Sequence, residues 1–225
     1  MKAPVHRLKK VEILWLAKNY CQHRHTYLDH YSCYLKEQPG RQERVGFFDI
    51  ETSNLDGDFG IMLSYCILDG ATGTILYTVL SKSDIDSAKI GKEDRRVVQA
   101  CINDLAKFDR IVGFYSKRFD VPFVRTRAMS CEVDFPQYGT IVHDDVYFVI
   151  RHRFKLSSNR LENACRVILG DTNKTRIEPK YWRAAVRGDK KSLAWILDHN
   201  KKDVIDLKRL YDRVLPFFRR QDVSL

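Results

Sequence analysis

Three separate stretches of this 225-residue sequence determine its predicted fold: VGFFDIE at 45–51, GFYSKRFDVPFV at 113–124 and LDHNKKDVIDL at 197–207. The first stretch is short, apolar and bounded by polar residues, which is typical of a buried strand. Two apolar runs follow it, IMLSYCILDG at 61–70 and ATGTILYTVL at 71–80, and a glycine-containing turn joins them. These two runs predict a β-hairpin directly after the first strand.

Helices and strands alternate along the rest of the chain. Apolar residues at helical spacing predict a helix over 92–108, and RIVGFY at 110–115 predicts a short strand. Pro122 is tolerated in the first turn of the helix that follows, and TIVHDDVYFVI at 140–150 holds another strand or its end. Beyond Leu161 the pattern is almost entirely helical, over 161–169, 179–187 and 190–214. We therefore predict an α/β fold with a mixed β-sheet flanked by helices.

The first 44 residues differ from the remainder. Four apolar residues recur at three- and four-residue spacings and predict an amphipathic helix over 7–20: Leu8, Val11, Leu14 and Trp15. Residues 21–44 are polar and rich in His, Tyr and Cys. We therefore predict two parts, an N-terminal helix with a Cys/His-rich segment at 1–44 and an α/β domain at 45–225.

The composition restricts the partners of this protein. There are 39 Lys and Arg against 29 Asp and Glu, a formal net charge of +10, which favours nucleic acid over a membrane surface as the polyanionic partner. No run approaches the roughly 18 apolar residues of a membrane span, and we expect no membrane association. Residues 1–10 lack the apolar run of a signal peptide. Six cysteines are too few for a disulfide framework, so we expect reduced thiols and a cytoplasmic protein.

Acidic residues stand at unusual places in the three stretches. Asp49 and Glu51 are two residues apart in the first strand, so both side chains point to one face. Two like charges in an apolar strand are costly unless a cation lies between them. Asp120 precedes a predicted helix, and His199 and Asp203 lie on one helical face. Carboxylates suit Mg²⁺ or Mn²⁺, and two such ions support phosphodiester hydrolysis.

Each of these side chains also has an ordinary interpretation. Asp120 is a suitable N-cap, and Asp203 is equally able to pair with a lysine. The pair of Asp49 and Glu51 is harder to explain in this way. The combination therefore predicts a two-metal-ion site, with His199 as general base because the ordinary pKa of histidine, about 6.5, suits proton transfer near neutral pH.

Taken together, the three stretches resemble the three motifs of the DEDD (DnaQ-like) 3′–5′ exonucleases, a family of the ribonuclease H-like superfamily. The resemblance spans residues 45–215. It implies a ribonuclease H-like fold and a metal-dependent 3′–5′ exonuclease that hydrolyses DNA or RNA with two Mg²⁺ or Mn²⁺ ions. The metal ligands that it implies are Asp49, Glu51, Asp120 and Asp203, with His199 as the base.

Two positions depart from the pattern of that family. Its third motif has His with four residues before Asp, or Tyr with three, whereas here three residues separate His199 from Asp203. Many members have Asn five residues before the second-motif Asp, where this chain has a tyrosine. The resemblance also implies a pocket for the terminal nucleotide, lined by Thr52, Ser53, Asn54, Leu55 and Tyr115.

The segment CQHRHTYLDHYSC at 21–33 brings two cysteines and three histidines into 13 residues. Zn²⁺ takes four nitrogen or sulfur ligands in a tetrahedron. The ligand set Cys21, His25, His30 and Cys33 is compatible with one structural Zn²⁺, and His23 competes with His25 for the third place. The alternative is a polar, aromatic loop without a metal.

Basic residues interleave with the motifs, namely Lys117 and Arg118 in the second and Lys201 and Lys202 in the third. Such a face attracts a phosphate backbone, which favours a nucleic acid partner. The resemblance implies that this partner is bound at single-stranded or 3′ ends. Two other functions fit the same residues. One is a nucleic-acid-binding module with an inactive site, and the other is a structure-selective endonuclease on the same fold.

Overall fold

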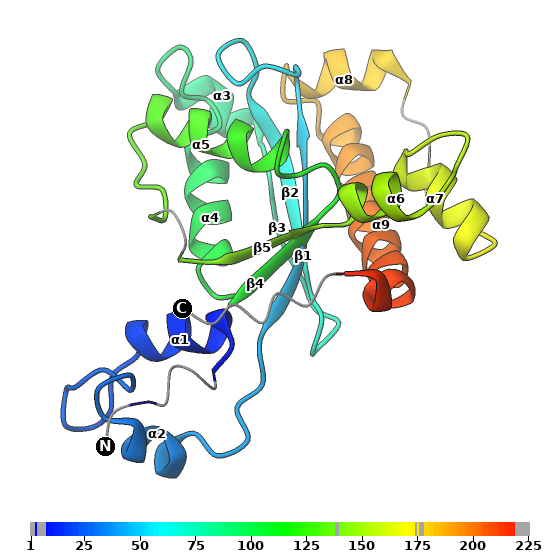
Figure 1. Cartoon of the computed structure of the whole chain (residues 1–225). Helices are drawn as coiled ribbons and strands as arrows, with labels where there is room; N and C mark the ends of the chain where they lie inside the picture. The colour runs from blue at the N-terminus through cyan, green and yellow to red at the C-terminus, as the bar shows by residue number, and fades with distance from the viewer. Residues whose placement is uncertain (1–2, 4–7, 138–139, 174, 176–177, 219–225) are drawn as a thin grey trace.

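The protein is described here from a computed structural model covering residues 3, 8–137, 140–173, 175 and 178–218. Two short helices precede a domain in which strands and helices alternate (Figure 1). The elements are α1 (Lys10–Lys18), α2 (Tyr31–Glu37), β1 (Val45–Thr52), β2 (Met62–Asp69), β3 (Ile75–Val79), α3 (Lys82–Ser87), α4 (Arg95–Leu105), β4 (Arg110–Gly113), α5 (Asp120–Ser130), β5 (Val142–Asp145), α6 (Val146–Arg153), α7 (Leu161–Ile168), α8 (Pro179–Ala185) and α9 (Lys190–Val214). A short 3-10 helix, Leu215–Phe217, follows α9.

The sheet has five strands in the order β3-β2-β1-β4-β5. Strand β1 pairs antiparallel with β2, which pairs antiparallel with β3, so the predicted hairpin is confirmed. On the other side of β1, strands β4 and β5 run parallel to it and to each other. The mixed sheet predicted from the sequence is therefore confirmed. Its central strand is β1, which carries Asp49 and Glu51.

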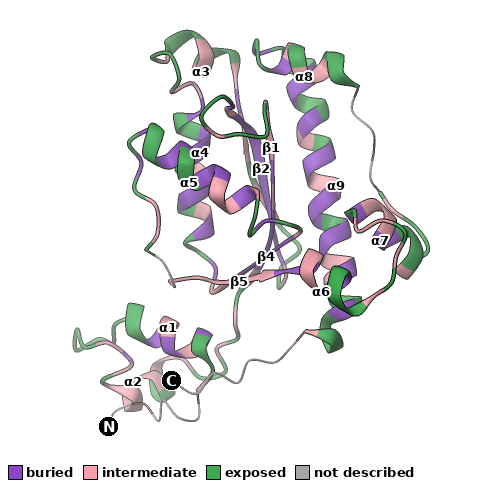
Figure 2. Ribbon diagram, turned by 45° about the horizontal axis from the view of Figure 1, so that its top comes forward, coloured by how far each residue is buried: buried purple, intermediate pink, exposed green. Residues whose placement is uncertain are grey.

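Helices cover both faces of this sheet (Figures 1 and 2). Because side chains alternate along a strand, Phe47 and Phe48 enter different cores. Phe48 packs with buried residues of α4 and α5, and Phe47 packs with the second half of α9 and with α6 and α7. Helix α9 thus lies against the face of β1 that also carries Asp49 and Glu51.

The segment at 140–150 contains the predicted strand, followed at once by a helix that was not predicted. Only Val142–Asp145 is a strand, and Val146–Arg153 is helix α6. The cause is Asp145, whose side chain accepts a hydrogen bond from the backbone N–H of Tyr147 at 3.1 Å. An acidic N-cap of this kind ends the strand and starts a helix at once. By contrast, α9 begins and ends at the predicted residues, 190 and 214.

The N-terminal segment has a small core of its own, made by Leu16, Cys21, Tyr27 and Cys33. Helix α1 is shorter than the predicted 7–20, since the chain is already extended at Lys9 and again at Asn19. This segment meets the domain at the start of β4, where Arg41 forms an ion pair with Asp109. Among the described residues, none of the helices has the length and apolar character that crossing a membrane requires.

Candidate active site

Strand β1 presents two acidic side chains toward helix α9. Asp49 and Glu51 are half-buried, whereas Phe48 and Ile50, which point to the opposite face, are fully buried. The alternation explains why carboxylates occur in an otherwise apolar strand, since the residues between them carry the core contacts. A register shift between Glu51 and Thr52 ends the regular pairing with β2 at this point. The two carboxylates therefore stand where the central strand leaves the sheet.

Helix α9 brings the third motif to these carboxylates. His199 and Asp203 are one turn apart on its buried face. The Nε2 atom of His199 lies 3.7 Å from Glu51 Oε1 and 3.7 Å from Asp203 Oδ2. One ligand atom from each of these three residues lies within 4.8 Å of the other two. On the other side of the imidazole, Nδ1 is 3.2 Å from the Oγ1 atom of Thr175.

Asp120 joins the same region from the first turn of α5. Its Oδ1 accepts a hydrogen bond of 3.1 Å from the backbone N–H of Ile50, the residue between the two acids of β1. The pKa of the Asp120 carboxyl is raised from 3.8 to about 7. Burial is the main cause, and the negative charges of Asp145 and Asp203 act in the same direction. Burial therefore disfavours the ionised form of Asp120 despite the hydrogen bond from Ile50.

This donor set suits a hard divalent cation. Glu51 and Asp203 converge with the imidazole of His199, and hydrogen bonds tie Asp49 to α9 and Asp120 to β1 in the same region. Hard oxygen donors favour Mg²⁺ or Mn²⁺ over softer metals. A cation would also supply the positive charge that a buried, ionised Asp120 requires. The residues present therefore fit the divalent metals implied by the sequence resemblance.

Asn200 is a site residue that the sequence prediction missed. It is fully buried, its Nδ2 donates to Asp49 Oδ2 at 2.6 Å, and its Oδ1 accepts from the Ser64 hydroxyl at 3.2 Å. The sequence does contain a signal, because Asn200 lies four residues after Ile196 and four before Val204, on the apolar stripe of α9. A polar residue on such a stripe needs a buried partner.

Asp145 is a second buried acidic residue of this region, and the sequence prediction did not include it. Its carboxylate accepts hydrogen bonds from the backbone N–H groups of Tyr115 at 2.8 Å and Lys117 at 3.0 Å, besides that of Tyr147. These bonds hold the loop before α5, in which Tyr115 has a left-handed backbone with φ 64. Asp145 therefore holds the loop that leads into Asp120.

The residues proposed to contact the terminal nucleotide lie at the end of β1, in the loop that follows it and in the loop before α5. Thr52 donates to the carbonyl of Asn54 at 2.7 Å, and the Ser53 hydroxyl accepts from the backbone N–H of Ile61 at 2.9 Å. The loop thus turns tightly and leaves Leu55 with 77% of its surface exposed. From the second loop, Tyr115 is 44% exposed and lies edge-on to Tyr147.

The N-terminal cysteines and histidines converge as well, but with a different histidine from the first choice in the sequence prediction. Ligand atoms of Cys21, His23, His30 and Cys33 all lie within 4.8 Å of one another. His25 is not in this group. Its backbone carbonyl accepts a hydrogen bond from Cys21 N–H at 2.9 Å, closing a narrow loop whose tip carries His23. The loop geometry, rather than the spacing alone, selects the histidine.

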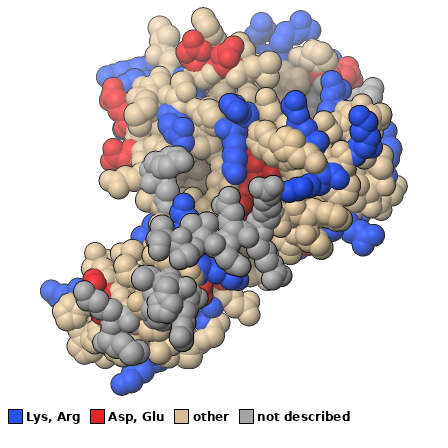
Figure 3. Space-filling model, viewed as in Figure 1, with Lys and Arg blue, Asp and Glu red and all other residues tan. Residues whose placement is uncertain are grey.

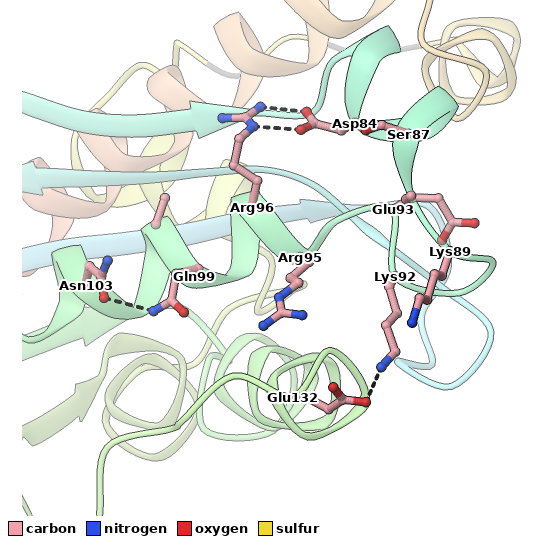
Figure 4. A pocket seen from close by; sticks show the side chains of 12 residues that line it. Asp84, Ser87, Lys89, Lys92, Glu93, Arg95, Arg96, Gln99, Asn103 and Glu132 are labelled. Carbon is pink, nitrogen blue, oxygen red and sulfur yellow. Dashed lines mark hydrogen bonds and ion pairs between the residues drawn. The ribbon is translucent and has the colours of Figure 1, made fainter.

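Basic side chains are spread over the surface of the domain. Figure 3 shows Lys and Arg side chains around a small group of acidic atoms on one face of the domain. A separate hollow of about 680 Å³ lies along α3 and α4 (Figure 4). Two of its cations are neutralised, Arg96 by Asp84 and Lys92 by Glu132. This hollow contains none of the motif residues and is not the site described above.

Comparisons with known proteins agree with this fold. A sequence model of the RNase H superfamily matches residues 46–215. A search among curated proteins gives no match. Among solved structures, the family B DNA polymerase from the hyperthermophilic archaeon Pyrobaculum calidifontis is similar, with a TM-score of 0.58 and 20% sequence identity. The match covers 78% of this chain and 25% of the polymerase chain, so this chain spans about a quarter of that polymerase's length.

Proposed function

This chain belongs to the RNase H superfamily, and we propose that it is a divalent-metal-dependent nuclease. Specifically, we propose a 3′–5′ exonuclease that removes nucleotides from single-stranded or frayed 3′ ends of DNA or RNA. The observation that carries this proposal is the meeting of Glu51, His199 and Asp203 within 4.8 Å. These residues come from stretches of sequence about 150 positions apart, and each stretch resembles one motif of the same exonuclease family.

In this proposal, four carboxylates are the metal ligands. Asp49, Glu51, Asp120 and Asp203 would hold two Mg²⁺ or Mn²⁺ ions. When bound, such ions stabilise the negative charge that develops during phosphodiester hydrolysis. The contribution of the protein is to hold the carboxylates in place before the substrate arrives. Asn200 does this for Asp49, and the backbone N–H of Ile50 does it for Asp120.

His199 is assigned the role of general base. Its Nε2 atom faces Glu51 and Asp203, and its Nδ1 atom faces the Thr175 hydroxyl. If Nδ1 carries the proton and donates it to Thr175, the lone pair of Nε2 is directed into the acidic site. Nε2 then accepts the proton of the attacking water as the phosphodiester bond breaks.

Substrate attraction comes from the rest of the surface. The chain has a formal net charge of +10, so a phosphate backbone is drawn toward it in a salt-sensitive manner. Leu55 and Tyr115 present exposed apolar surface beside the carboxylates. We assign them to contact with the base or sugar of the terminal nucleotide, together with Thr52, Ser53 and Asn54.

The proposal also includes a boundary between two parts of the chain. We propose that residues 45–225 contain the nuclease domain and that residues 1–44 form a separate extension. The match to the RNase H superfamily begins at residue 46, which supports this boundary. The separate small core of Leu16, Cys21, Tyr27 and Cys33 supports it as well.

Shortening of 5′-labelled oligonucleotides tests this function. Single-stranded DNA and RNA of one sequence are prepared with a free or a chemically blocked 3′ end, and are incubated with Mn²⁺, Mg²⁺ or EDTA. We expect a ladder of single-nucleotide steps from free 3′ ends with either metal, and none in EDTA or with the block. The Asp49→Asn variant is expected to produce no ladder.

The other outcomes each contradict part of the proposal. Internal cleavage that ignores the 3′ block would replace the exonuclease assignment with an endonuclease on this fold. Binding of the oligonucleotides that persists in EDTA, without cleavage of either sugar type in Mn²⁺, would replace the hydrolase with a nucleic-acid-binding module.

A further inference from the structure

The structure assigns a second metal site to the N-terminal extension: we infer that Cys21, His23, His30 and Cys33 bind one structural Zn²⁺. This site is separate from the proposed nuclease site and does not depend on hydrolysis. It consists of two sulfur and two nitrogen donors, a ligand set that selects Zn²⁺ over the hard cations favoured by carboxylates.

The distances between the donor atoms match a tetrahedron around zinc. With Zn–S near 2.3 Å and Zn–N near 2.0–2.1 Å, the edges of such a tetrahedron are roughly 3.3–3.8 Å. The measured edges are 3.4 Å from Cys21 Sγ to His30 Nδ1, and 3.4 Å from Cys33 Sγ to His23 Nδ1. The distance from Cys21 Sγ to His23 Nδ1 is 3.8 Å. Cys33 Sγ lies 3.8 Å from His30 Nε2, so the imidazole of His30 presents a different nitrogen to each cysteine. The three distances from sulfur to Nδ1 lie within the range expected for a zinc tetrahedron.

Backbone structure directs these four side chains to one point. Tyr20 and Thr26 pair as an antiparallel bridge, and Arg24 has a left-handed backbone with φ 63 that reverses the chain between them. Cys21 and His23 lie on this narrow loop. His30 is the N-cap of α2, and Cys33 follows in its first turn. A loop and a helix start are the two elements that a short zinc module needs to present two ligands each.

The surroundings explain why the extension would need a metal. Among the described residues, its core cluster has four buried members, of which two are the cysteines themselves. A core this small does not stabilise a segment of this length without a crosslink or a metal. All six cysteines of the chain are free thiols, so no disulfide supplies the crosslink. Two histidines converge on the cysteine pair, which a disulfide would not require.

The position of the cluster makes its role structural. The extension leads into Val45 at the start of β1, whereas Glu51 lies near the end of the same strand. Six residues of strand separate them, which is about 20 Å. Ion pairing of Arg41 with Asp109 fixes the extension to that remote end of the sheet. Zinc there would order the extension and would not take part in chemistry at the acidic cluster.

Metal analysis of the full chain tests the inference. After purification under reducing conditions and dialysis against metal-free buffer, we expect about one zinc ion per chain by mass spectrometry of the metal content. Replacement of zinc by Co²⁺ is expected to give the visible d–d bands and thiolate charge-transfer band of a tetrahedral sulfur-ligated site. Neither readout depends on activity.

Matched variants identify the ligands. His23→Ala and Cys33→Ser are expected to lose most of the zinc, whereas His25→Ala retains it, because His25 is only two residues away but outside the cluster. Glu51→Gln also retains it, which separates this site from the acidic one. Circular dichroism of each variant shows that the domain remains folded.

Three results would overturn the inference. One is wild-type protein without zinc and without a tetrahedral Co²⁺ spectrum. Another is loss of zinc in His25→Ala with retention in His23→Ala. The third is a Cys21–Cys33 disulfide in protein purified under reducing conditions. If the oligonucleotide ladder is absent while zinc is present, the nuclease proposal fails and the zinc site stands.

Discussion

Asn200 on α9 donates a hydrogen bond of 2.6 Å to Asp49 on β1, and so links the third motif to the first across the face of the sheet. Its other end accepts from Ser64 on β2, which lies opposite Glu51 in the strand register. A single buried amide therefore connects two strands and a helix at the acidic cluster. This relationship gives the most specific prediction about how the carboxylates are kept ready for metal.

Removing the Asn200 amide is expected to impair catalysis through Asp49. In Asn200→Ala, kcat or metal affinity should fall by about 10–100-fold, as is typical when a residue that orients a metal ligand is lost. The free energy of unfolding should also fall by about 1–3 kcal/mol, because buried hydrogen bonds are removed. Steady-state kinetics with a Mn²⁺ titration measures the first effect, and urea denaturation the second.

Ser64→Ala is the matched control for this variant. It removes the other hydrogen bond of Asn200 and leaves the one to Asp49 in place. We expect a comparable loss of stability and little loss of activity. Equal losses of activity in both variants would mean that Asn200 acts through packing and not through the Asp49 carboxylate.

The pKa of Asp120 predicts how metal binding changes stability with pH. Burial raises this pKa from 3.8 to about 7, so between these values the metal-free folded protein binds a proton that the unfolded chain does not. The free energy of unfolding therefore falls as pH rises through this range. Mg²⁺ binds the ionised carboxylate and should raise Tm more at pH 8 than at pH 5.

Thermal denaturation with and without Mg²⁺ at the two pH values measures this difference. The variant Asp120→Asn has no carboxylate to ionise and is expected to flatten the pH dependence of the metal-free protein. A Tm increase from Mg²⁺ that is the same at both pH values would contradict the assignment of Asp120 as a metal ligand.

His199 is predicted to act as a base and not as a metal ligand. Replacement by glutamine should therefore slow the chemical step by about 10²–10⁴-fold, while Mn²⁺ affinity stays near that of the wild type. Single-turnover cleavage and calorimetric titration with Mn²⁺ measure the two quantities separately. A large loss of Mn²⁺ affinity in His199→Gln would move this residue into the metal-ligand set.

The lowered pKa of His143, which is not one of the proposed metal ligands, leads to a second prediction about how stability depends on pH. Burial and the nearby charges of Lys117 and Arg125 lower its pKa to about 4, and its Nε2 lies 2.8 Å from the Ser116 hydroxyl. Below pH 6.5 the unfolded chain gains a proton that the folded protein does not take up until about pH 4. The free energy of unfolding should therefore decrease by about 3 kcal/mol as the pH falls from 6.5 to 4.

Denaturant unfolding between pH 4 and pH 7 measures that slope. It should be reduced in His143→Gln and unchanged in His152→Gln, a substitution on the exposed surface of α6. An identical slope in wild-type protein and His143→Gln would show that other groups cause the pH dependence.

Much of the fold was accessible from the sequence because the local patterns were strong. The short apolar run at 45–51 and the helical pattern over 190–214 each predicted their element within one residue. Helix α6 was missed because VYFVI has the composition of a strand, and only the cap made by Asp145 starts a helix there. The cap and the burial of Val146 and Ile150, one helical turn apart, together favour the helix.

Site residues were predictable where a motif concentrates them, and not where contacts cross the sheet. Glu51, His199 and Asp203 were identified from spacing, and the structure brings them together. Asn200 was overlooked although it is adjacent to His199, because its partners are remote in sequence. The choice between His23 and His25 likewise depends on a loop closed by backbone hydrogen bonds, which spacing alone does not reveal.

The rate of nucleotide release by Asp203→Asn, compared with Asp198→Asn, tests the central claim most directly. Both residues are aspartates on α9, but Asp203 lies 3.7 Å from His199 whereas Asp198 pairs with Lys202 on the surface. With Mn²⁺ and a single-stranded oligonucleotide, we predict that Asp198→Asn retains wild-type release. Asp203→Asn should lose at least about a hundredfold, since metal-assisted charge stabilisation is worth several kcal/mol. Equal rates for the two variants would contradict the account of this acidic cluster as a metal-dependent nuclease site.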